Sequence, residues 1–132
     1  MPPVTDLQEL LRNLSPKRNP GTYVFTTVRD TSGIERTLPV ATMQEPEGTT
    51  LVVKQEVADG LGLAYTYRAA WITLRVHSDL SAVGLTAAVA TALATEGISC
   101  NAMAGYYHDH LFVDVERAEA ALEVLRRLTT AE

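Results

Sequence analysis

Cysteine is almost absent from this chain: Cys100 is the one cysteine among 132 residues. An intramolecular disulfide is therefore impossible, which fits a reducing compartment. If this segment is a strand, Cys100 shares one face with the apolar residues Ile98 and Ala102, two positions away on either side. This position predicts a buried structural thiol rather than a nucleophile.

Long apolar runs and a cationic leader are also missing. The first residues contain no cationic segment followed by a long apolar run, so we expect no signal peptide. The most apolar stretch, around residues 83–94, is rich in alanine and threonine and too short to span a bilayer. Together these absences predict a cytoplasmic protein with no membrane partner.

Basic residues are in the minority, because 11 Lys and Arg stand against 16 Asp and Glu and leave a net charge of −5. An acidic balance argues against a broad phosphate-binding surface. Lys17, Arg18 and Arg36 form no stripe with interleaved aromatic side chains, so we expect no nucleic-acid partner.

The chain is long enough for one compact domain or for two small subdomains that share a core. In the N-terminal half, residue patterns predict a helix over 6–14, strands over 22–28 and 50–53, a turn at 44–48 and a short helix over 55–61. Residues 15–21, Ser-Pro-Lys-Arg-Asn-Pro-Gly, are rich in breakers and predict a connecting link.

The second half has a clearer order. Its patterns predict a strand over 71–77, a helix over 84–96, strands over 98–105 and 108–114, and a last helix capped by Asp114. This order is most of a βαββαβ unit, so the predicted fold class is α+β and ferredoxin-like. The fourth strand is expected from the N-terminal half, with Tyr23–Val28 as the favoured segment, or from a partner chain.

Both helices of this unit should cover the same face of the sheet, because crossover connections are right-handed. The other face then carries the apolar side chains of Trp71, Met103, Tyr107 and Phe112. Such a face is too apolar to be left in water. We therefore expect cover from the N-terminal segment or a second subunit, and we predict a homodimer that buries Trp71 and Phe112.

Several segments resemble the ACT domain superfamily of small-molecule regulatory modules, and most closely the short bacterial ACT-domain proteins related to cytosolic arginine sensors. The matching residues are Tyr23-Val-Phe25, Glu45–Val53, and the run Ile72–His110 with Val83–Val89, Gly97–Asn101 and Tyr106–His110 inside it. The resemblance implies an ACT domain over residues 71–132 and a smaller, incomplete ACT-like part over residues 1–70.

The resemblance also implies a binding site, because effectors of this superfamily usually bind where the first strand meets the first helix, beside the second strand. In this chain those positions, with one of the histidines, are Ser78, Asp79, Gly84, Leu85, Thr86, Ser99, Asn101 and His110. Asp79 and Gly84 are more widely spaced than in the enzyme-linked modules, and Ser99 stands where those modules often have asparagine.

The helix start at Gly84 supports a ligand site on chemical grounds. Glycine allows close backbone approach, and a helix N-terminus favours a carboxylate. Asp79 could meet an ammonium group, so the two together suit a zwitterionic amino acid. The alternative is a tight strand-to-helix turn in which Asp79 or Ser81 caps the helix.

His108-Asp-His110 is the most catalytic-looking pattern. Residues two apart on a strand face the same way, so both imidazoles could reach one metal, with His77 as a third ligand. The favoured alternative is a hairpin whose histidines bond the backbone, a partner subunit or an effector, because no carboxylate or cysteine completes a metal set. We expect no metal and no other cofactor.

The leading functional hypothesis is a non-catalytic sensor that binds a small-molecule effector, an amino acid or related metabolite. A structural protein–protein interaction module without a ligand is the alternative. A metal-dependent enzyme that uses His108 and His110 is a weaker third hypothesis.

Overall fold

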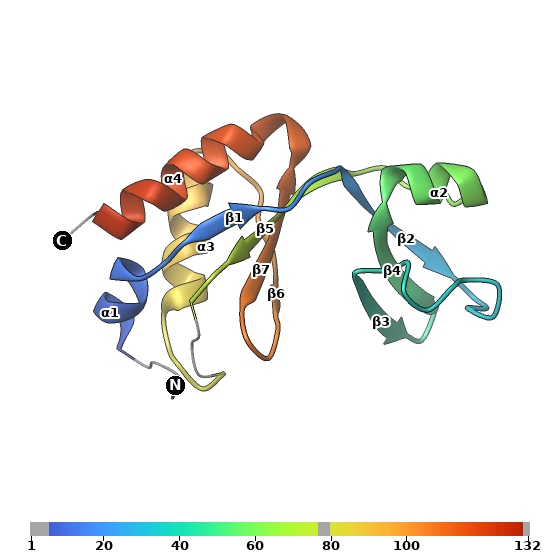
Figure 1. The fold of residues 1–132 in the computed structure, drawn as a ribbon, viewed down its shortest axis with the longest axis horizontal. Coiled ribbons are helices and arrows are strands. Elements are labelled where there is room, and N and C mark those ends of the chain that lie inside the picture. Colours follow the sequence, from blue (N-terminus) through green and yellow to red (C-terminus); the bar gives the residue numbers. More distant parts are fainter. Residues whose placement is uncertain (1–5, 77–79, 131–132) are drawn as a thin grey trace. The chain divides into compact units, whose positions relative to one another are not determined.

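The computed structural model describes residues 6–76 and 80–130 and divides the chain into two compact units. One unit joins Met1–Pro20 to Ala70–Glu132, and the other is Gly21–Ala69. The first 20 residues therefore group with the C-terminal unit and not with residues 21–69. Figure 1 labels the elements of both units.

The larger unit is a ferredoxin-like α/β sandwich. Its sheet has the strand order β1-β5-β7-β6, and the strands are β1 (Pro16–Arg18), β5 (Arg68–Leu74), β6 (Asn101–Ala104) and β7 (Asp109–Asp114). Its helices are α1 (Leu7–Arg12), α3 (Leu85–Thr95) and α4 (Ala118–Thr130), the last preceded by the 3-10 turn η1 (Val115–Arg117). Strand, helix, two strands and helix therefore follow in the expected order, as the first five elements of a βαββαβ unit.

The fourth strand of this sheet comes from a segment that the sequence pattern predicted as a link. β1 pairs antiparallel with β5, with Lys17 opposite Thr73. Backbone bonds from Asn19 N to Trp71 O (2.8 Å) and from Arg75 N to Ser15 O (2.9 Å) extend the ladder at both ends. The fourth strand thus comes from the N-terminal half, as expected, but from Pro16–Arg18, whereas Tyr23–Val28, the favoured segment, pairs with β5 only at the start of that strand. The strand at Pro16–Arg18 was not predicted because it is short and begins with a proline, a residue that is tolerated at the first position of an edge strand.

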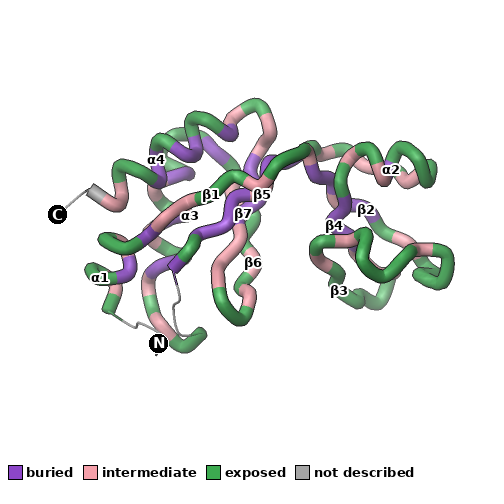
Figure 2. The backbone as a smooth tube through the Cα atoms, in the orientation of Figure 1, coloured by how far each residue is buried: buried purple, intermediate pink, exposed green. Residues whose placement is uncertain are grey.

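One hydrophobic core joins the helices to one face of the sheet (Figure 2). Alternate residues of β5 and β7 enter it, such as Ile72 and Leu111, and the same core contains Val89 of α3 and Leu125 of α4. The same-face arrangement of the two long helices is thus as expected. Leu10 of α1 is fully buried in this core, and Asp6 caps α1 by accepting bonds from Gln8 N and Glu9 N.

The opposite face of the sheet carries Trp71 and Phe112, whose rings stack with centroids 6.2 Å apart. Phe112 is only 2% exposed within a single chain, so its burial does not require a second subunit. Tyr107, which was expected to join this face, is 65% exposed. The homodimer therefore stays a prediction, without the support that we expected from Phe112.

The smaller unit is a small antiparallel sheet with one short helix. Its strands β2 (Tyr23–Val28), β3 (Ala41–Glu45) and β4 (Gly48–Lys54) have the order β3-β4-β2, and the start of β5 pairs with β2. Helix α2 (Gln55–Leu61) ends at Gly62, which has a left-handed φ of 67°. The sequence did not predict β3, because it is a largely exposed strand without apolar alternation.

Candidate functional site

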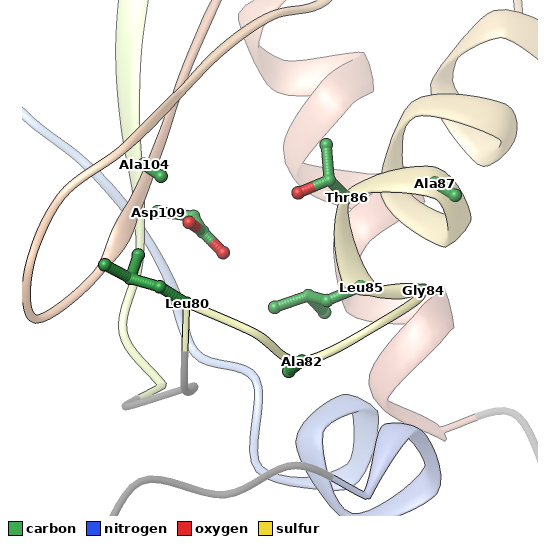
Figure 3. Close-up of a pocket in the computed structure, with 8 residues that line it drawn as sticks. All are labelled: Leu80, Ala82, Gly84, Leu85, Thr86, Ala87, Ala104 and Asp109. Carbon is green, nitrogen blue, oxygen red and sulfur yellow. The ribbon is translucent and has the colours of Figure 1, made fainter.

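A cavity of about 130 Å³ opens in the larger unit at the start of α3 (Figure 3). It lies between that helix start, the segment that precedes it and the end of the β6–β7 hairpin. The described residues that line it are Leu80, Ala82, Gly84, Leu85, Thr86, Ala87, Ala104 and Asp109. Aliphatic side chains thus surround three polar features, namely a helix N-terminus, the Thr86 hydroxyl and a carboxylate.

The helix N-terminus is shaped by Gly84, which has a φ of 105° and provides no side-chain cap for α3. A Cβ at this position would lie 3.1 Å from Leu7 Cδ2, in tight contact with helix α1. Glycine therefore meets two local demands, a left-handed backbone and a close approach of two helices. The first backbone N–H groups of α3 have no intrahelical acceptor, so they favour an anionic ligand.

The carboxylate belongs to Asp109, the first residue of β7. Strand alternation places Asp109 in phase with Leu111 and Val113, which enter the core on the helical side of the sheet. Its side chain points into the cavity from the strand, opposite the hydroxyl of Thr86 on α3 (Figure 3). No cation among the described residues forms an ion pair with it.

Burial raises the pKa of Asp109 above its ordinary value, and nearby His110 and His108 partly oppose this by lowering it. Desolvation disfavours the charged form of a carboxyl group, so Asp109 is ionised at some cost in free energy at neutral pH. A cationic ligand group beside it would reduce that cost. Asp109 is therefore suited to receive an ammonium group.

The structure brings some of the expected site residues together and separates others. Gly84, Leu85 and Thr86 line the cavity. Ser99 does not line it, and the Asn101 side chain instead donates to the Phe112 carbonyl oxygen at 3.4 Å. Ser78 and Asp79 lie outside the described residues.

His110 faces the other side of the sheet, where it belongs to a polar network. Trp71 Nε1 donates to His110 Nδ1 at 3.0 Å, and Thr73 Oγ1 lies 3.2 Å from the same nitrogen. Asn19 Nδ2 in turn donates to Thr73 Oγ1 at 2.9 Å. An indole N–H can only donate, so Nδ1 must accept and the neutral imidazole must carry its proton on Nε2.

These bonds also bear on the metal hypothesis. The lone pair of His110 Nδ1 is directed at Trp71, so this nitrogen is engaged with an N–H donor. Within residues 6–76 and 80–130, no three His, Cys, Asp or Glu side chains are grouped to hold a metal ion. His77, the third ligand of that hypothesis, lies outside the described residues.

Sequence reasoning missed Asp109 as a site residue, together with the alanines and Leu80 that shape the cavity. A usable signal was present, because Asp109 is an acidic residue in strand phase with core residues Leu111 and Val113. The prediction of a buried structural thiol at Cys100 agrees more closely with the structure. Cys100 packs against the core and is half-buried, and burial raises the pKa of its thiol.

Comparison with known protein families identifies both halves of the chain. Residues 2–70 match one family model described as an ACT domain, and residues 66–127 match a second model with the same description. No curated protein matches this chain. No helix in the described ranges is both long and apolar enough to cross a membrane.

Solved structures give the same fold. A Vibrio cholerae protein of unknown function, described as a possible transport protein, is 49% identical, and the match covers 93% of this chain and 95% of that protein with a TM-score of 0.84. A protein from Agrobacterium tumefaciens is 14% identical, with 88% and 89% coverage and a TM-score of 0.63.

The ligand-free regulatory subunit of aspartate kinase from Thermus thermophilus is also similar. It is 14% identical, with 86% of this chain and 95% of that subunit covered and a TM-score of 0.60. At such identities the likeness shows the fold alone.

Proposed function

Because the chain belongs to the ACT domain family, we propose that it is a non-catalytic regulatory protein whose effector is an amino acid bound at the start of α3. The observation that carries this proposal is that Asp109 and the start of α3 at Gly84 line one cavity. The helix start suits a carboxylate, and Asp109 suits an ammonium group. A free amino acid presents both groups a short distance apart.

Further support comes from the fold and the cysteine content. The same fold occurs in the regulatory subunit of aspartate kinase, and the sequence resembles short ACT-domain proteins related to arginine sensors. A single cysteine is consistent with the reducing cytoplasm. Regulation requires that the effector bind one arrangement of the protein better than another, and the homodimer predicted from the sequence would supply two such arrangements.

Thermal unfolding in the presence of each of the twenty amino acids tests the proposal. A ligand that binds only the folded state adds about 2.7 kcal/mol at a concentration about a hundredfold above its dissociation constant. We expect at least one amino acid to raise the melting temperature of the wild type. Asp109→Asn should abolish this rise, because the amide cannot neutralise an ammonium group.

The Asp109→Asn variant is a clean test because we expect it to fold. A carboxyl group with a raised pKa costs stability at neutral pH, so its replacement by a neutral amide should leave the unliganded melting temperature unchanged or higher. Glu123→Gln, at an exposed position on α4, is the matched control and should keep the response to ligand. A wild type that responds to none of the twenty amino acids would refute the amino-acid proposal.

A ligand-free interaction module is the second candidate. It is favoured by Tyr106 and Tyr107, which are 75% and 65% exposed at the tip of the β6–β7 hairpin and contact each other edge to face. Exposed aromatic side chains are enriched at protein–protein interfaces. Sedimentation of the purified chain, with and without amino acids, separates an assembly that depends on ligand from one that does not.

A further inference from the structure

We infer that the effector is a small amino acid with an uncharged side chain, and that Ala104 sets the limit on its size. This inference rests on the proposed function and specifies the ligand of the same cavity. It follows from three properties of the cavity, namely its volume, the chemistry of its walls and the position of Ala104 beside Asp109.

The volume of the cavity is the first property. At about 130 Å³ it is well below the roughly 300–1,000 Å³ of pockets that enclose drug-sized molecules. An engineered protein cavity of about 150 Å³ holds benzene. Alanine has as many non-hydrogen atoms as benzene, whereas arginine has twice as many. The cavity therefore has room for the common part of an amino acid and a very short side chain.

The walls of the cavity are the second property. Once the helix start and Asp109 have received the carboxylate and the ammonium group, the remaining described lining is aliphatic apart from the Thr86 hydroxyl. No second charged side chain is among these lining residues. A cationic or anionic side chain would then lose water without gaining a partner, which is costly. Arginine and glutamate should therefore be rejected by charge as well as by size.

The position of Ala104 is the third property. Ala104 is directly opposite Asp109 in the β6–β7 ladder, and its methyl group lies beside the carboxylate at the cavity (Figure 3). A ligand whose ammonium group contacts Asp109 therefore lies beside this methyl group. Ala104 is also solvent-exposed on the outer strand of the hairpin, so a larger residue should be tolerated by the fold.

Calorimetric titration of the full chain tests this inference with glycine, alanine, serine, leucine, phenylalanine, arginine and glutamate. We expect glycine, alanine or serine to bind at least tenfold more tightly than any of the last four. Ala104→Leu should weaken binding of the preferred ligand at least tenfold, because the added atoms occupy the cavity. Ala120→Leu, an equal change at an exposed position on α4, is the control and should bind like the wild type.

The outcomes separate this inference from the proposed function. If leucine, arginine or glutamate binds as tightly as alanine and Asp109→Asn abolishes that binding, the inference on size and charge is overturned while the amino-acid site stands. Normal binding of the preferred ligand by Ala104→Leu would also overturn the inference and leave the amino-acid site intact. If none of these seven amino acids binds the wild type, the inference fails, and the proposed function fails with it when the other thirteen also leave the melting temperature unchanged.

Discussion

At the scale of single residues, His110 shows how a sheet can fix the state of a titratable group. Its Nδ1 accepts from Trp71 Nε1, so protonation of that nitrogen would place two N–H groups against each other. Burial lowers the pKa of His110, His108 lowers it further, and Asp109 partly opposes both effects. The bond to Trp71 and the burial therefore favour the same neutral form.

This arrangement predicts a stability that depends on pH. Because the folded pKa of His110 is depressed, the stabilisation is complete above the unfolded value of about 6.5 and is lost as the pH falls through the folded pKa. His110→Asn keeps an acceptor where Nδ1 lies but removes the titration. Urea unfolding from about pH 7.5 to 5.5 should therefore show a smaller loss of stability in the variant than in the wild type.

His108→Gln is the control, and we expect it to keep most of the wild-type loss. A tautomer measurement by nitrogen NMR gives an independent check, since His110 should carry its proton on Nε2 at neutral pH. An Nε2 without a proton, or identical pH profiles for His110→Asn and the wild type, would contradict the assignment of Nδ1 as the acceptor for Trp71.

The sequence predicted some site residues and missed others for identifiable reasons. Gly84 was recognisable because a glycine before an apolar helical stripe indicates a special backbone position, and its φ of 105° agrees. Asp109 was not predicted because the neighbouring pair His108 and His110 is the stronger chemical pattern. Asp109 lies between these histidines in the sequence, and its side chain is on the opposite side of the strand. The strand alternation that groups the histidines also directs Asp109 toward the helices.

At the scale of elements, long periodic segments were predictable and short edge strands were not. The α3 and α4 helices have apolar residues at helical spacing, and most of these residues are buried in one core. β1 and β3 lack such a pattern, since each is short and largely exposed. Their conformation comes from pairing with β5 and β4, which is information that a local window does not contain.

β1 gives a prediction at this scale. Backbone bonds at Asn19 and Ser15 join the odd-numbered residues of this segment to β5. Antiparallel ladders alternate, so Lys17, opposite Thr73, belongs to a hydrogen-bonded pair. Lys17→Pro removes that N–H and should reduce the free energy of unfolding by about 1–3 kcal/mol.

Lys17→Ala keeps the N–H and loses only an exposed side chain, so its free energy of unfolding should lie within about 0.5 kcal/mol of the wild-type value. Denaturant unfolding of the two variants makes the comparison. Equal stability of the two would mean that the N-terminal strand contributes little to the sheet.

At the scale of the whole molecule, the boundary between the two sequence matches differs from the boundary between the two compact units. The two ACT-domain matches divide the sequence near residue 70, whereas β1 and α1 belong to the unit that contains residues 70–132. Residues 21–69 are therefore inserted in the chain between β1 and the part of β5 that pairs with it. A local reading of the sequence could not find this, because the pairing of β1 with β5 spans more than 50 residues.

The insertion predicts which fragment can fold. A chain of residues 70–132 lacks both β1 and α1, so it should leave one side of β5 unpaired and the core open where Leu10 packs. Asn19 N bonds to Trp71 O at 2.8 Å, so Asn19 and Trp71 form a hydrogen-bonded pair at this end of the ladder. An Asn-Gly turn can join two antiparallel strands at such a point.

We therefore expect a chain of residues 6–19, Asn-Gly and residues 71–132 to unfold in one cooperative transition, whereas residues 70–132 alone should show none. Circular dichroism during thermal unfolding makes this comparison. Because the cavity lined by Gly84, Ala104 and Asp109 lies wholly in this unit, the joined chain should also be stabilised by the same amino acid as the full protein. If residues 70–132 alone unfold as cooperatively and at as high a temperature as the joined chain, the N-terminal segment is not an integral part of the unit.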